Sequence, residues 1–339
     1  MIMKFYRLKE YCNYIIQENL VENLAIKVGK WDEVFFENYY SKTAIISEQT
    51  LFDMASVSKI LCTTSLALIA IDKGILSVRD SVSKFFDLPE EKAELTIYHL
   101  LTHTIGMGHK GLNIPGVTRQ NVAEFILGIP NDIPIGSNVL YSCPGFILLG
   151  FILEKVFGET LDKAFQRFVT EPLNMTHTTF GTTSMDVVNS NAKLHERGLV
   201  NDYNCRYLGG VCGNAGVFSN MHDMTKYAKM LLQRGKPLFS QATFDKAVQN
   251  YTSGMNEARG LGFLYIDDNY AQTAGLFESG AIGHCGHTGQ SIFVDYRSGL
   301  YVIVLSDATI STIRRYGKED YSKVMQMRHD LHHAIMEDL

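Results

Sequence analysis

The chain has 339 residues, of which 46% are hydrophobic and 20% are charged, and its formal net charge at pH 7 is -5. These proportions are typical of a soluble globular protein and argue against a disordered chain. The acidic balance provides no basic field for nucleic acid or anionic lipid, so we expect neither as a partner.

The sequence also indicates the compartment. Residues 1–20 indicate a helix and lack the apolar region and the small-residue cleavage site of a secretory signal. The most apolar stretches, 60–71 and 146–153, are shorter than the roughly 20 residues that span a bilayer. Six cysteines without a C-x-x-C pair favour reduced thiols. We therefore expect a cytoplasmic protein without a membrane segment.

The first elements after the N-terminal helix are a hairpin and a buried helix. Residues 24–42 carry β-branched and aromatic side chains around a Gly-Lys-Trp-Asp turn, which predicts two antiparallel strands. Residues 56–76 are apolar on almost every face, which predicts a helix in the middle of the molecule.

Helical patterns then dominate residues 84–250, and strand patterns return only towards the end of the chain. These strands are predicted at 259–267, 290–296 and 299–307, before a closing helix at 319–339. We expect an α+β fold in which both chain ends build one antiparallel sheet, flanked by terminal helices and interrupted by an inserted, mainly helical domain. The prediction is one unit over 1–339, with a sheet part at about 1–55 and 255–339 and a helical part at about 60–250.

Two S-x-x-K tetrads compete for the role of nucleophile, Ser56 to Lys59 and Ser81 to Lys84. Residues three apart share a helix face, so a lysine amine can accept the serine proton if burial lowers its pKa. Ser56 opens the apolar helix, where free N–H groups would stabilise an oxyanion and burial would lower the pKa of Lys59. Ser81 lies in a polar stretch ending at a proline, which predicts a surface loop. We predict Ser56 as the nucleophile; the alternative is a simple helix cap.

Four stretches, taken in order, resemble one family. They are "FDMASVSKI", "LTIYHLLTHTIGM", "YSCPGFILLGFILEKVFG" and "GGVCGNAGVFSNMHDMTKYAKMLL". Together they resemble motifs of the serine β-lactamase and penicillin-binding protein superfamily, in its class C-like esterase and D-peptidase branch. The resemblance covers about 51–307 and implies a β-lactamase-like fold, an acyl-enzyme mechanism and no cofactor.

The resemblance assigns Tyr141 as the general base and acid that shares a proton with Lys59 and Ser56. A nearby ammonium is expected to lower the phenol pKa; the alternative is a tyrosine that only precedes a helix. Cys143 stands where the family usually has an asparagine that binds substrate, which argues against efficient β-lactam turnover. No neighbour in the sequence offers Cys143 a low-pKa setting, so a buried thiol is favoured over a nucleophile.

The family's third motif falls in "GHCGHTGQSIFVD", Gly283 to Asp295, which contains two similar triplets. Aligned through its flanks, His284 is the third-motif base, Cys285 replaces a threonine and Gly286 allows close approach of substrate. His287 then supplies the second oxyanion N–H beside that of Ser56. The alternatives are a shifted register in which His287 fills the motif, and a Gly-rich turn before an edge strand whose histidines are structural.

The remaining polar residues predict no metal site. His99 and His103 are spaced i, i+4, but Leu100 follows where a metalloprotease needs glutamate, and the resemblance implies a structural role for them. His329, His332 and His333 share a helix face without a second cluster to complete a site. Asn201 and Asn214 replace histidines of the family in loops expected near the cleft.

We therefore predict a serine hydrolase for a small ester, amide or β-lactam, with carboxylesterase or D-Ala-type peptidase activity ahead of β-lactamase activity. The alternative is a catalytically impaired, penicillin-binding-like protein that binds a ligand or partner without turnover. The sequence leaves the oligomeric state open.

Overall fold

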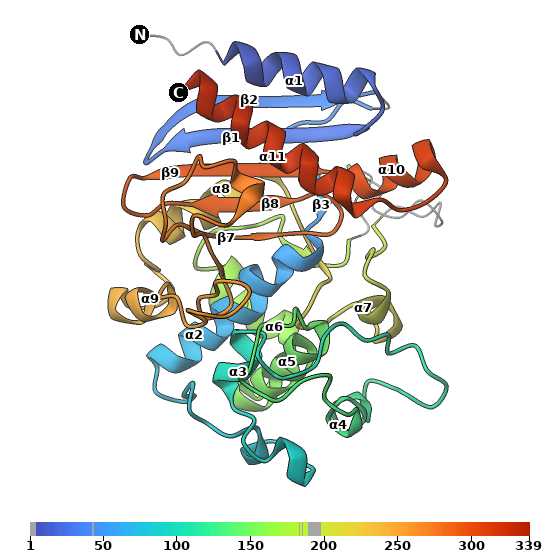
Figure 1. The fold of residues 1–339 in the computed structure, drawn as a ribbon, viewed down its shortest axis with the longest axis vertical. Coiled ribbons are helices and arrows are strands. Elements are labelled where there is room, and N and C mark those ends of the chain that lie inside the picture. The colour runs from blue at the N-terminus through green and yellow to red at the C-terminus, as the bar shows by residue number, and fades with distance from the viewer. Residues whose placement is uncertain (1–4, 43, 183, 185, 189–197) are drawn as a thin grey trace.

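A six-stranded antiparallel sheet forms the upper half of the molecule (Figure 1). The computed structural model describes residues 5–339 except 43, 183, 185 and 189–197. The strand order is β2-β1-β9-β8-β7-β6. The bounds are β1 Asn23–Lys30, β2 Glu33–Ser41, β6 Leu264–Tyr265, β7 Ile282–Cys285, β8 Ser291–Val294 and β9 Leu300–Ser306.

The two chain ends meet in the centre of this sheet. β1 pairs with β9 in a register that sets Leu24 opposite Ser306. The predicted hairpin is confirmed, with β1 and β2 joined at Trp31, whose φ of 54° supplies the left-handed residue of a tight turn. The sheet built from both ends and the α+β class are therefore as predicted.

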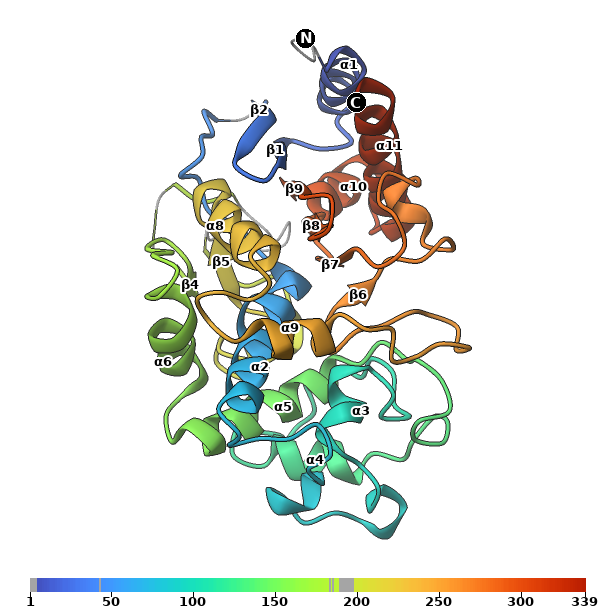
Figure 2. The same ribbon diagram turned by 90° about the vertical axis from the view of Figure 1, so that its left-hand side faces the viewer.

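Alternation along the strands gives the sheet two apolar faces. Leu24, Ile26 and Val28 pack under α1 (Tyr6–Gln17) and α11 (Tyr321–Asp338), which lie side by side across one face (Figures 1 and 2). Ala25 belongs to the larger core on the other face, where α8 (Met221–Leu232) packs against β8 and β9. The candidate site lies towards the β6 end of the sheet, where β7 faces the helical part.

The helical part lies below the sheet and surrounds a buried central helix (Figure 2). This central helix consists of the π-helix Lys59–Thr64 and α2 Ser65–Asp72. The other α-helices of this part are α3 Ile97–Leu101, α4 Val122–Gly128, α5 Cys143–Phe157, α6 Leu161–Phe165, α7 Tyr203–Tyr207 and α9 Gln241–Ala247, and α10 Ala308–Tyr316 lies beside the sheet. A small sheet of order β3-β5-β4 is formed by β3 Phe52–Asp53, β5 Val217–Ser219 and β4 Thr179–Phe180. Short 3₁₀ or π segments occupy Ala55–Val57, Lys59–Thr64, Val82–Lys84, Glu90–Lys92, Gln166–Thr170 and Ala271–Thr273.

The structure departs from the sequence prediction in three places. The helix predicted at 56–76 is composite: a 3₁₀ turn, a π-helix and then α2. The strand predicted at 259–267 contributes only β6, and β7, α10 and the small sheet were not predicted. These elements are too short or too dependent on tertiary partners to show a period in the sequence.

One segment, Ala55–Asp72, is long and apolar enough to meet the composition of a membrane span. Inside the fold 83% of that window is buried. The core of the helical part therefore accounts for its apolar character.

Candidate active site

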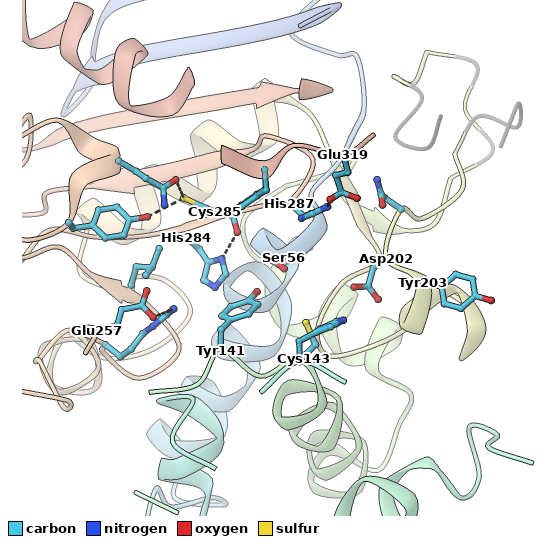
Figure 3. Close-up of a pocket in the computed structure, with 17 residues that line it drawn as sticks. Ser56, Tyr141, Cys143, Asp202, Tyr203, Glu257, His284, Cys285, His287 and Glu319 are labelled. Carbon is cyan, nitrogen blue, oxygen red and sulfur yellow. Dashed lines mark hydrogen bonds and ion pairs between the residues drawn. The ribbon is translucent and has the colours of Figure 1, made fainter. Parts of the chain in front are cut away.

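A cavity of about 700 Å³ opens between β7 and the helical part (Figure 3). Four of its lining side chains face the same space and come from three segments: Ser56 from the turn before the central helix, Tyr141 and Cys143 from the start of α5, and His284 from β7. The rest of the wall is polar or aromatic: His109, Asn201, Asp202, Tyr203, Glu257, Arg259, Leu264, Tyr270, Gln272, Cys285, His287, Glu319 and Tyr321.

Ser56 sits on a turn whose backbone is strained. The preceding residue, Ala55, is buried and has a φ of 45°, a left-handed conformation that costs an alanine about 1–2 kcal/mol. The Asp53 carboxylate accepts the Ala55 N–H at 2.8 Å and holds this conformation. The 3₁₀ turn from Ala55 to Val57 thereby directs Ser56 to the cavity before the chain enters the core.

Lys59 is fully buried and has three acceptors for its three protons. Its Nζ lies 3.1 Å from Ser56 Oγ, 2.9 Å from the Asn214 carbonyl oxygen and 3.6 Å from Cys143 Sγ. This is the bonding pattern of an ammonium. Burial alone would lower the pKa of Lys59, but the negative forms of Cys143 and Tyr141 outweigh it and raise that pKa. The sequence-based expectation of a lowered lysine pKa is therefore wrong.

Tyr141 lies over Lys59, whose Nζ is 5.0 Å from the centre of the phenol ring. Burial raises the pKa of Tyr141 more than the Lys59 charge lowers it, so the expected lowering is also wrong. The His103 ring lies 4.7 Å from that of Tyr141, and its Nδ1 accepts the Ser142 N–H at 3.0 Å. His103 is therefore structural, as the resemblance implied: it fixes the segment that carries Tyr141.

The two histidines of the doubled triplet have different environments. His284, on β7, is 2% exposed, and its ring lies 6.2 Å from that of Tyr141. Its Nδ1–H donates to the Cys285 carbonyl at 2.9 Å, while Nε2 has no partner among the described residues. Burial and the charges of Lys59 and Arg259 hold the pKa of His284 far below its usual value, so the ring is neutral with a free lone pair.

His287 lies in the loop after β7 and its side chain is 45% exposed. Its ring stacks on Tyr321 at 5.2 Å and pairs with Glu319 at the rim of the cavity. The unshifted register therefore brings His284, and not the His287 side chain, beside Tyr141. The proposed oxyanion donors, the N–H groups of Ser56 and His287, remain a prediction.

Gly286 and Cys285 complete the motif on this strand. A Cβ on Gly286 would lie 2.9 Å from the Met54 carbonyl oxygen, so glycine is needed where β7 approaches the segment before Ser56. The Cys285 thiol lies 3.4 Å from the Tyr270 hydroxyl, on the cavity wall. Buried Arg328 donates to the carbonyls of Gly286 and Gln290 and so fixes the turn after β7.

The second tetrad lies at the surface, as predicted. Ser81 caps a 3₁₀ turn by accepting the Ser83 N–H at 3.1 Å, and Lys84 pairs with Asp80 with its side chain 59% exposed. Neither residue lines the cavity. The same four letters therefore occur once in the cleft and once outside it.

Several cavity residues were not identified from the sequence. His109 and Asp202 lie in loops without periodicity, and Arg259 begins the segment predicted as a strand, so only tertiary structure shows that they share a wall. Arg259 is 3% exposed and pairs with Glu257 at 2.8 Å, and its Nε and Nη1 have no partner among the described residues. Asn201 lines the cavity and Asn214 holds Lys59, so both loops lie near the cleft as expected. Within the described ranges no group of three or more His, Cys, Asp or Glu side chains could hold a metal ion.

This chain was compared with family models, with curated proteins and with solved structures. Residues 17–320 match the family model described as "Beta-lactamase". A protein of Salmonella paratyphi B named "Putative D-alanyl-D-alanine carboxypeptidase" is 26% identical over 78% of this chain and 71% of its own length. The octameric penicillin-binding protein homologue of Pyrococcus abyssi superposes with a TM-score of 0.74 and 21% identity over 92% of this chain and 77% of its own. EstCE1, a hydrolase with promiscuous acyltransferase activity, superposes with a TM-score of 0.76 and 21% identity over 96% of this chain and 97% of its own.

Proposed function

This chain belongs to the beta-lactamase family, a family of serine hydrolases, and we propose that it hydrolyses a small ester or amide through an acyl-enzyme formed on Ser56. Membership confirms the resemblance seen in the sequence and the β-lactamase-like fold. The observation that carries the proposal is the 3.1 Å contact between Lys59 Nζ and Ser56 Oγ at the wall of the cavity, beside Tyr141.

The protonation states suggest how the serine is activated. Lys59 as an ammonium donates to Ser56 Oγ, so the serine hydroxyl proton is free to point to Tyr141, which lines the same cavity. As Oγ bonds to the substrate carbonyl carbon, its proton passes to the phenol oxygen, and neutral His284 offers the free Nε2 that can take the proton of Tyr141. The same groups return a proton to the leaving alcohol or amine.

Deacylation follows the same path in reverse. Water attacks the acyl carbon, gives its proton to the relay and releases the carboxylic acid, while Ser56 Oγ recovers its proton. The buried Lys59 charge stabilises the developing negative charge on Oγ throughout, and the N–H groups of Ser56 and His287 are proposed to stabilise the carbonyl oxygen.

Arg259 supports a substrate that ends in a carboxylate. Two of its nitrogens are buried without a partner, and its guanidinium carbon lies 5.7 Å from the centre of the Tyr141 ring, close to the reacting groups. A substrate carboxylate can accept a charge-assisted hydrogen bond from such a guanidinium. D-Ala-type peptides and acid-bearing esters are therefore preferred candidates, and neutral esters are the comparison.

Two alternatives have less support. A β-lactamase role is weakened because Cys143 replaces an amide with a thiol, which cannot offer two N–H donors. The site does not favour the alternative of a catalytically impaired protein that only binds a ligand, because Ser56, Lys59 and Tyr141 lie within reach of one another. The cytoplasmic location stays a prediction.

Intact mass spectrometry tests the proposal. A fluorophosphonate should add one adduct to the wild type and to Ser81→Ala, the matched control from the surface tetrad, and none to Ser56→Ala. Hydrolysis of p-nitrophenyl esters should follow the same pattern, and Arg259→Ala should lose activity mainly on esters that carry a carboxylate. Labelling or turnover that persists in Ser56→Ala would refute Ser56 as the nucleophile.

A further inference from the structure

The thiol of Cys143 lies in the reaction cleft, yet the hydrolysis proposed at Ser56 gives it no chemical step. Cys143 is the first residue of α5 and lines the cavity, with 4% of its surface exposed. It shares Lys59 with the nucleophile, because Nζ lies 3.1 Å from Ser56 Oγ and 3.6 Å from Cys143 Sγ. One lysine therefore serves two potential nucleophiles.

Three positive groups from three separate segments act on this sulfur. Lys59 approaches from the central helix, and His109, in the loop after α3, lines the same cavity and acts to lower the pKa of the thiol. The third is the amino end of α5, a 15-residue helix whose cap, Ser142, accepts the Gly145 N–H at 3.2 Å. A helix amino end, a lysine and a histidine are the settings that stabilise thiolates in proteins.

The groups that oppose a thiolate are fewer. Asp202 and Tyr141 face the same sulfur, and burial by itself raises the pKa of Cys143. The charge of Lys59 and the effect of His109 outweigh these effects and lower the pKa of Cys143 below its usual value. Cys143 in turn raises the pKa of His109, as expected for a thiolate–imidazolium pair.

The other cysteines provide an internal contrast. All six are free thiols. Burial raises the pKa of Cys12 to about 12 and raises that of Cys62 well above its usual value, while Cys205 is raised by its hydrogen bond with Cys212 and by burial. Cys143 is the cysteine for which a lowered pKa is found. This setting replaces the inert buried thiol expected from the sequence.

We propose that Cys143 is a second nucleophile of the cleft, a thiolate held by Lys59, His109 and the amino end of α5, which small soft electrophiles modify and whose modification stops chemistry at Ser56. The thiol reactivity stands by itself, whereas the loss of hydrolysis rests on the proposed function. The ligands are small alkylating agents and peroxides that fit the 700 Å³ cavity.

Both reactions balance without a further reagent. With iodoacetamide, Sγ bonds to the methylene carbon, the carbon–iodine bond breaks and iodide leaves. With hydrogen peroxide, Sγ bonds to one oxygen and the O–O bond breaks; sulfur is oxidised to sulfenic acid, and the departing hydroxide takes a proton, supplied by His109, to form water. Each product removes the negative charge that faces Lys59 and adds atoms beside Ser56.

Alkylation at controlled pH tests the thiol. The wild type is treated with iodoacetamide at pH 6, where an ordinary thiol is less than about 1% ionised, and the adduct is counted by intact mass and located by peptide mapping. One adduct on Cys143 is expected, it should persist in Ser56→Ala and Cys285→Ala, and it should be absent from Cys143→Ser. His109→Asn should slow the reaction at pH 6 by about tenfold as the thiolate fraction falls.

Fluorophosphonate labelling of Ser56 tests the consequence. Pre-alkylated wild type should lose labelling, while Cys143→Ser treated in the same way should label as its untreated sample does. An adduct confined to Cys285, or no Cys143-dependent adduct at pH 6, would overturn the reactive thiol. If Ser56 is still fully labelled after complete alkylation of Cys143, the proposal that this modification stops chemistry at Ser56 is refuted. Alkylated Cys143 in a protein that Ser56 reagents never label would contradict the proposed hydrolase and leave the thiol site standing.

Discussion

The two histidines of the doubled triplet allow a sharp test of the site. The change is His284→Ala compared with His287→Ala, each measured as kcat/KM on a p-nitrophenyl ester. His284 lies beside Tyr141 with a buried, unpartnered Nε2, whereas the His287 side chain is about half exposed and engaged with Glu319 and Tyr321.

The expected magnitudes follow from these environments. A positioned acid–base group contributes about 10²- to 10⁴-fold, so His284→Ala should lower kcat/KM by that factor, or about 3–5 kcal/mol in transition-state stabilisation. A surface ion pair is worth about 0–1 kcal/mol, so His287→Ala should lose less than about fivefold. Its backbone N–H, the proposed oxyanion donor, is retained by alanine.

The control separates catalysis from folding. His284→Gln keeps a polar side chain in the buried position, and thermal unfolding of each variant shows whether the fold survives. Fluorophosphonate labelling of Ser56 reports the acylation step alone. If folded His287→Ala loses as much activity as folded His284→Ala, the shifted register is right and the assignment of His284 is refuted.

Three further predictions test other parts of the structure. Gly286→Ala should cost about 1–3 kcal/mol of unfolding free energy, read by urea denaturation, because its Cβ would meet the Met54 carbonyl at 2.9 Å; unchanged stability would mean that the turn is loose. Cys143→Asn should raise the rate of acylation by penicillin, followed by intact mass, if the missing amide limits it; an unchanged rate would remove that explanation. Burial lowers the pKa of His332 to about 4 in the folded protein, whereas the same imidazole in the unfolded chain has a pKa of about 6.5. Below about pH 6.5 protons therefore bind the unfolded chain more readily than the folded protein. About 3 kcal/mol of stability, present above pH 6.5, should be lost as pH falls to 4, and His332→Leu should reduce that loss; an equal loss in both proteins would refute the assignment.

Much of the fold was predictable because its signals are local. The hairpin of 24–42, the buried segment after Ser56 and α11 each carry their own period and turn residues, and the pairing of the two chain ends follows from where the strand patterns occur. β7 has only four residues, and its strand character depends on pairing with β8. Such an element has no independent signal in the chain.

The sequence by itself determined the family, the fold class and which residue types are present for chemistry, because motif order and periodicity are properties of the chain. It could not separate Ser56 from Ser81 by motif alone, and it gave the wrong direction for the pKa of both Lys59 and Tyr141. Electrostatic effects depend on distance and burial, and only the tertiary structure sets the 3.6 Å between Lys59 and Cys143 and the reach of His109. The change of Cys143 from an expected inert thiol to a candidate nucleophile follows from those distances.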